Sequence, residues 1–125
     1  MRRILVVDDE PNFANMVKFN LEATGSYEVR VESSGSRALM TALRYQPDLV
    51  LLDVIMPDKE GPEVMFQFRL SNETRHIPIV FLTATVTKQE VDAQDGMIGG
   101  HAFLAKPGSV SELVNCIERH LAIMN

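Results

Sequence analysis

Two short segments made almost wholly of large apolar residues constrain the fold of this chain most. They span residues 3–7 and 48–52, and a short apolar run without polar alternation is typical of a parallel strand buried on both faces. Each run stops at acidic residues: Asp8 and Asp9 follow the first, and Asp53 follows the second. If the two strands are neighbours in one sheet, the three carboxylates meet at a single edge.

Strand-like and helix-like segments alternate along the rest of the chain, which predicts an α/β fold with a parallel sheet. Three further strands are expected, at residues 27–32, 79–82 and 102–105. Five helices are expected, at residues 11–24, 36–45 and 62–70, from 87 to the glycine pair at 99–100, and from 109 onward. The last two begin with sequences of the capping-box form. The methionines are expected to fill the core, namely Met16, Met40, Met56, Met65 and Met97.

The order of the strands follows from the pattern of the second one. Residues 27–32 alternate apolar and charged side chains, which suits an edge strand with one solvated face. With short right-handed crossovers, this favours a doubly wound five-stranded parallel sheet in the order 2-1-3-4-5. Ligands of such sheets bind at the carboxyl ends of the strands, beside the point where the chain reverses. Thr83 and Lys106 end the fourth and fifth strands at the same edge as the three carboxylates.

Length and charge narrow the class of protein. A chain of 125 residues fits one domain. Its net charge of −5 at pH 7, without a run of Lys or Arg, argues against nucleic-acid binding. The single cysteine, Cys116, cannot form an internal disulfide and points to a reducing cytoplasm. No apolar stretch approaches the ~18 residues of a membrane span, so a cytoplasmic domain without membrane contact is expected.

The residues at the predicted edge suit one kind of chemistry. Clustered carboxylates favour a hard cation, Mg²⁺ before Zn²⁺, because no Cys or His lies in the motif. One carboxylate can then attack a phosphoryl group and form an acyl phosphate. Lys106 and Thr83 would contact further phosphoryl oxygens as a positive charge and a hydrogen-bond donor. The set predicts transfer of a phosphoryl group onto an aspartate.

These residues give the chain a resemblance to the receiver domain of bacterial two-component response regulators. The matching segments lie at residues 5–10, 51–57 with Gly61, 81–84 and 100–107, in the family's order and spacing. The resemblance covers residues 1–125 as one receiver domain. It implies the flavodoxin-like (αβ)5 receiver fold and a role in phosphorelay signal transduction.

The resemblance implies a role for each acidic residue. Asp53 resembles the phosphoacceptor and a metal ligand. Asp9 resembles the direct Mg²⁺ ligand, and Asp8 resembles the residue that acts mainly through water. The backbone carbonyl of Ile55 resembles a further ligand, and Mn²⁺ is implied as a substitute for Mg²⁺.

The resemblance also implies how phosphorylation is sensed. Thr83 matches the switch hydroxyl that moves toward the phosphoryl group, and Phe103 matches the aromatic residue that changes rotamer with it. Together they would reshape the face made by the fourth helix, fifth strand and fifth helix. Lys106 matches the phosphate-contacting lysine, and its bond to Pro107 is implied to be cis.

The implied donor is a sensor histidine kinase, a phosphotransfer protein or a small acyl phosphate. The implied receiver of the signal is a separate protein target or an output domain outside these 125 residues, and a phosphorylation-dependent homodimer is a further implication. No direct nucleic-acid binding and no membrane contact are expected of the chain itself. It is expected to accept phosphate and to hydrolyse it weakly, not to turn over substrates as an enzyme does.

Two positions depart from the family's pattern. Ile55, two residues after Asp53, cannot orient a hydrolytic water, and Thr85, two residues after Thr83, is short and uncharged. Slow autodephosphorylation is therefore expected. Ile55 also stands where a haloacid-dehalogenase-type phosphatase places its second Asp, which argues against that class, and the acidic first loop would repel a flavin phosphate. A degenerate receiver that acts as a constitutive interaction module remains the alternative.

Overall fold

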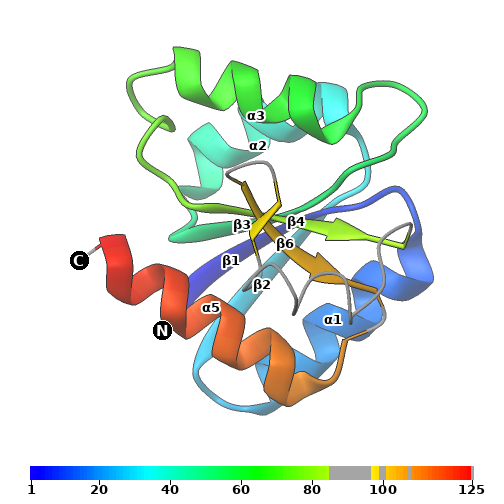
Figure 1. Cartoon of the computed structure of the whole chain (residues 1–125), viewed down its shortest axis with the longest axis vertical. Coiled ribbons are helices and arrows are strands. Elements are labelled where there is room, and N and C mark those ends of the chain that lie inside the picture. The colour runs from blue at the N-terminus through cyan, green and yellow to red at the C-terminus, as the bar shows by residue number, and fades with distance from the viewer. Residues whose placement is uncertain (85–96, 99–100, 107, 125) are drawn as a thin grey trace.

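A computed structural model describes residues 1–84, 97–98, 101–106 and 108–124. It has three layers, with the sheet between α1 and α5 on one face and α2 and α3 on the other (Figure 1). The strands are β1 Arg2–Val7, β2 Tyr27–Glu32, β3 Leu49–Asp53, β4 Ile79–Thr83, β5 Met97–Ile98 and β6 His101–Ala105. The helices are α1 Pro11–Ala23, the 3-10 turn η1 Gly35–Arg37, α2 Ala38–Tyr45, α3 Gly61–Leu70 and α5 Val110–Met124.

The strand order is β2-β1-β3-β4-β6-β5, and all neighbours pair in parallel except β5, which pairs antiparallel with β6. Since β6 is the fifth parallel strand, the predicted order 2-1-3-4-5 is confirmed. The prediction of a helix reaching residue 98 is wrong, because Met97 and Ile98 form the short strand β5. These two apolar residues pair with part of the otherwise open edge of β6. The remainder of that predicted helix, from Thr87, lies outside the described residues.

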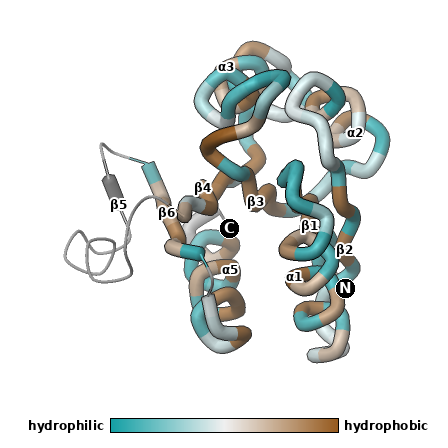
Figure 2. Tube along the Cα trace, turned by 90° about the vertical axis from the view of Figure 1, so that its right-hand side faces the viewer, coloured by the Kyte–Doolittle hydropathy of each residue, from teal (hydrophilic) through white to brown (hydrophobic). Residues whose placement is uncertain are grey.

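The central strands are buried on both faces, as their continuous apolar runs predict. In β1, Ile4 and Val6 face the core under α1 and α5, whereas Leu5 and Val7 face the core under α2 and α3. The two middle strands β3 and β4 are likewise buried throughout. In Figure 2 hydrophobic colour predominates along the inner strands, whereas the helices have mixed colour. Each fully buried Val or Leu contributes roughly 1.5–3 kcal/mol of transfer free energy.

Local signals set the helix ends. Pro11 begins α1, where its missing N–H costs no hydrogen bond. The predicted capping box of α5 is confirmed: the Glu112 N–H donates to Ser109 Oγ at 3.1 Å, and the Ser109 N–H donates to Glu112 Oε1 at 3.3 Å. Gln46 ends α2 in the left-handed region, at φ 53°. No helix in the described part of the chain is long and apolar enough to cross a membrane.

The methionine prediction is only partly confirmed. Met56 is buried, but Met16 and Met40 are 40% and 54% exposed. Both lie on the outer faces of α1 and α2, where helical position outweighs residue type. Met65 is partly buried beside the core, and the side chain of Met97 lies outside the described part of the structure.

Candidate functional site

The carboxyl ends of four parallel strands bring the predicted residues to one edge. Asp8 and Asp9 follow β1, Asp53 ends β3, Thr83 ends β4 and Lys106 follows β6. The strands end nearly in step, because their registers pair residues 53 with 82 and 83 with 105. A cleft of about 270 Å³ opens there, lined by Asp9, Glu10, Asp53, Val54, Ile55, Thr83, Ala84 and Lys106. The sequence prediction that these side chains share one edge is confirmed.

Lys106 lies among the carboxylates. Its Nζ is 2.6 Å from Asp8 Oδ2, 3.4 Å from Asp53 Oδ1 and 3.9 Å from Glu10 Oε1, and its side chain is 7% exposed. The ammonium also lies 4.5 Å from the centre of the Phe13 ring, within the range of a cation–π contact. In the backbone, the Lys106 N–H donates to the Thr83 carbonyl at 2.8 Å, which holds the lysine beside β4.

The charges in the cleft shift each other's titration. Burial, together with the nearby Asp8 carboxylate, raises the pKa of Asp53 to about 6, although Lys106 partly offsets this rise. For Lys106, burial opposes the charged form, but the Asp8 and Asp53 carboxylates outweigh it and raise the pKa of the ammonium above its usual value. The lysine is therefore a fixed positive charge, and Asp53 holds a proton more readily than an exposed aspartate.

The donor set fits a divalent cation. Asp8, Asp9 and Asp53 each offer a carboxylate oxygen, and these three oxygens lie within 4.8 Å of one another. Asp8 Oδ1 accepts the Glu10 N–H at 2.9 Å. The buried Asp8 Oδ2 lies 2.6 Å from Lys106 Nζ, within reach of a charge-assisted hydrogen bond. Three hard oxygen donors suit Mg²⁺.

The two predicted switch residues lie on neighbouring strands. Thr83 is 2% exposed and lines the cleft from the end of β4. Phe103 is half-buried in β6, and its ring packs on that of Phe81, with centres 5.1 Å apart. Phe81 in turn contacts His101 edge-on. These positions fit the predicted switch, and the movement itself stays a prediction.

Further site predictions are not tested by this geometry. The Ile55 side chain is 58% exposed at the mouth of the cleft, and its carbonyl as a metal ligand stays a prediction. Pro107, and with it the predicted cis bond from Lys106, lies outside the described residues. Thr85 does as well.

Two residues at this site are not among those predicted from the sequence. Glu10 directly follows the acidic pair, and this adjacency was a usable signal. Phe13 approaches Lys106 from the first turn of α1. Only the three-dimensional arrangement reveals this contact, because the two residues are far apart in the chain.

The sheet order and the acidic edge define a class: a doubly wound α/β domain with a cluster of carboxylates at its switch point that could hold a metal ion. The chain belongs to the response regulator receiver domain family, whose model matches residues 4–118. It is therefore a receiver domain of the two-component signalling type, and the family resemblance seen in the sequence is confirmed.

Individual relatives agree with this assignment. The chain is 35% identical over 114 residues to the DNA-binding dual master transcriptional regulator RpaA of Synechocystis; the match covers 91% of this chain and 46% of that protein. Among solved structures, chemotaxis protein CheY4 of Vibrio cholerae matches with a TM-score of 0.80 and 30% identity, over 96% of this chain and 98% of that one. The N-terminal domain of a receiver protein from Methanoculleus marisnigri matches with a TM-score of 0.71 and 33% identity, over 98% of each chain.

Proposed function

We propose that this domain accepts a phosphoryl group on Asp53, with Mg²⁺ as cofactor, and passes the signal on by a change of surface. One observation carries the proposal. Asp8, Asp9 and Asp53 bring three carboxylate oxygens within 4.8 Å of one another, and Lys106 pairs with two of these residues. The proposed donors are a sensor histidine kinase, a phosphotransfer protein or a small acyl phosphate.

The transfer is a displacement at phosphorus. An oxygen of the ionised Asp53 forms a bond to phosphorus, while the bond to the donor's nitrogen or acyl oxygen breaks and the donor keeps the electron pair. Mg²⁺, held by Asp8, Asp9, Asp53 and the Ile55 carbonyl, would supply positive charge to the phosphoryl oxygens. Lys106 holds its proton and can exchange its contact with Asp53 for one with the new phosphoryl group.

The signal is proposed to leave the site through Thr83 and Phe103. A hydroxyl that moves toward the phosphoryl group vacates space beside β4, and Phe103 can turn into that space from the neighbouring strand. Phe103 already packs on Phe81 of β4, which supports the coupling. The face around β6 and α5 would then differ between the two states.

The partner of that face lies outside this chain. Because the chain spans 46% of its relative RpaA, we propose either an attached output domain or a separate protein as the target, with phosphorylation-dependent dimerisation as one means of switching. The domain is proposed to act as a phosphoacceptor with weak autophosphatase activity and to reside in the cytoplasm.

To test the proposal, the protein is incubated with Mg²⁺ and a small acyl phosphate, and its intact mass is then measured by mass spectrometry. We expect the wild type to gain one phosphoryl group and Asp53→Asn to gain none. Asp9→Ala should weaken Mg²⁺ binding, so unchanged binding would remove the metal assignment. If the wild type accepts no phosphoryl group from any donor, a histidine kinase included, the proposal is wrong and the constitutive interaction module takes its place.

A further inference from the structure

The loop that carries the metal and phosphoryl contacts of β3 is held at both ends. Residues 54–60 connect β3 to α3 and line the cleft with Val54 and Ile55. The Val54 N–H donates to the backbone of β4 at 3.2 Å, and the Gly61 N–H donates to the Val54 carbonyl at 2.8 Å. Gly61 is needed for this approach, because a Cβ there would lie 2.5 Å from the Asp53 carbonyl oxygen. Between the two ends, Met56 is buried in the core and Asp58 makes polar contacts with a second loop.

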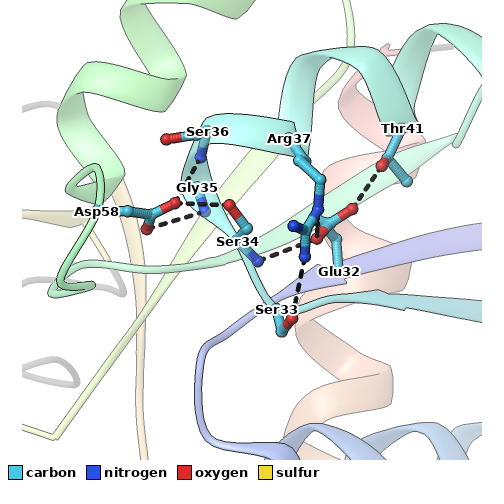
Figure 3. Close-up of polar contacts among 8 residues, drawn as sticks. All are labelled: Glu32, Ser33, Ser34, Gly35, Ser36, Arg37, Thr41 and Asp58. Atoms are coloured by element: carbon cyan, nitrogen blue, oxygen red, sulfur yellow. Dashed lines mark hydrogen bonds and ion pairs between the residues drawn. The ribbon is translucent and has the colours of Figure 1, made fainter.

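Asp58 binds the turn that precedes α2 (Figure 3). Asp58 Oδ2 accepts a hydrogen bond from Ser34 Oγ at 2.5 Å and another from the Ser36 N–H at 3.0 Å. Asp58 Oδ1 accepts one from the Gly35 N–H at 3.3 Å. The carboxylate therefore satisfies backbone donors at the start of η1, where Ser34 itself provides no side-chain cap. The hydrogen bond from Ser34, followed by those from the backbone, holds the pKa of Asp58 well below its usual value. Asp58 is thus a charged acceptor shared between two loops.

The turn that Asp58 binds is itself fixed, and it supports the other side of the site. The buried carboxylate of Glu32 accepts the Thr41 hydroxyl at 2.6 Å, the Ser34 N–H at 3.0 Å and Arg37 Nε at 3.2 Å (Figure 3). The Glu32 backbone carbonyl accepts the Asp8 N–H at 3.0 Å. A continuous chain of hydrogen bonds therefore leads from Asp8, through this turn, to the loop after β3.

The two loops also pack closely where Asp58 joins them. Gly35 is buried, and a Cβ on it would clash with the carbonyl oxygen of Lys59. The Asp58 carboxylate also accepts the Lys59 N–H at 3.0 Å. Together, the hydrogen bonds to Asp58 fix the distance between the two loops and their relative direction, because several donors define one orientation of the carboxylate.

We propose that Asp58 is a positioning residue for phosphoryl acceptance: by tying residues 54–60 to the turn before α2, it holds the backbone at Ile55 in the geometry that the cation and the incoming phosphoryl group require. The inference rests on the function proposed for Asp53. Asp58 touches none of the reacting atoms and acts through the loop. Without it, the loop keeps its end anchors and the buried Met56 side chain but loses its polar tie to the turn before α2, so ordering the backbone at Ile55 for metal binding would cost more conformational entropy.

The experiment compares Asp58→Ala, Asp58→Asn and a control, Thr74→Val, in the full chain. Thr74 is buried beyond α3, where its hydroxyl donates to the Phe68 carbonyl at 2.7 Å, so the control removes a hydrogen bond away from the site. Two quantities are measured below the melting temperature of every variant. One is the rate of phosphoryl gain from a small acyl phosphate at saturating Mg²⁺, and the other is the Mg²⁺ dissociation constant from amide shifts in NMR spectra without a donor.

For Asp58→Ala we expect a rate about tenfold lower and a Mg²⁺ dissociation constant about threefold higher, in line with the sensitivity of such reactions to small misplacements. Asp58→Asn keeps one acceptor oxygen, which can still accept from Ser34 and Ser36, and should recover part of both losses. Thr74→Val should lower the melting temperature and leave both quantities at wild-type values.

Two results would overturn the inference. The first is that Asp58→Ala gains the phosphoryl group at the wild-type rate and binds Mg²⁺ with the wild-type affinity. The second is that Thr74→Val loses as much rate and affinity as Asp58→Ala, which would assign the effect to stability alone. If the wild type accepts no phosphoryl group, the proposed function fails separately, and the Mg²⁺ dissociation constants still decide the role of Asp58. If the wild type also binds no Mg²⁺, both proposals fall.

Discussion

Replacing Asp53 by Asn is predicted to stabilise the protein at pH 8 when divalent cations are chelated. The Asp53 carboxylate is nearly buried, and burial together with the Asp8 charge raises its pKa to about 6. The raised pKa means that the ionised form is disfavoured in the folded protein relative to the unfolded chain. Asn has nearly the same shape and carries no charge, so it removes this penalty.

The size of the effect follows from the pKa. A rise from 3.8 to about 6, at about 1.4 kcal/mol per unit, corresponds to about 3 kcal/mol as an upper limit. The cleft admits water, and Asn loses the contact of Asp53 with Lys106 at 3.4 Å, so we expect about 1–2 kcal/mol. Because the folded pKa is the higher one, the penalty is fully present above pH 6 and disappears as the pH falls toward 3.8.

The assay is urea unfolding followed by circular dichroism, in EDTA, at pH 8 and pH 4. We expect Asp53→Asn to be more stable than the wild type at pH 8 and about equal to it at pH 4. Glu63→Gln is the control, since it removes an exposed carboxylate from the first turn of α3. A variant that is less stable at pH 8, or a difference that does not change with pH, would refute the electrostatic reasoning.

Four further predictions concern single positions. Gly61→Ala should cost about 1–3 kcal/mol of stability in urea unfolding, because the new Cβ meets the Asp53 carbonyl oxygen at 2.5 Å; an unchanged midpoint contradicts this. Phe13→Leu should cost about 0.5–1 kcal/mol through the lost cation–π contact with Lys106, and Phe13→Tyr should not. Ser109→Ala should cost about 1 kcal/mol by removing the α5 cap, measured by thermal unfolding. The phosphorylated wild type should keep its phosphoryl group for minutes or longer, because Ile55 cannot orient a water; a lifetime of seconds, followed by intact mass, contradicts this.

The sheet and the site edge could be predicted because their signals are local. The apolar runs of β1 and β3 indicate strands buried on both faces, and the alternating pattern of β2 together with short right-handed crossovers favours one order of the strands. Once that order is known, Asp8, Asp53 and Lys106 must meet, since each ends its own strand. The capping box that begins at Ser109 is also a local signal, and its prediction is confirmed.

The features that escaped prediction depend on side-chain direction or on pairs distant in sequence. Strand β5 has only two residues, too few to show a period. The residue type of Met16 predicts a place in the core, although its position on α1 leaves it 40% exposed. The contacts of Asp58 with the turn at Ser34 join two loops that are separated by a helix and a strand, and neither loop carries a signal of the other.

The ion pair between Lys106 and Asp8 bears on how the chain is made. Its two members stand near opposite ends of the sequence, so a growing chain has synthesised all three acidic residues long before their positive neighbour. Until then, closing β1 against β3 would bring unbalanced negative charge to one edge. The last parallel strand therefore completes both the sheet and the charge balance of the cleft. A chain truncated before β6 lacks this charge balance as well as the cover that α5 gives one face of the sheet, and it should fold poorly.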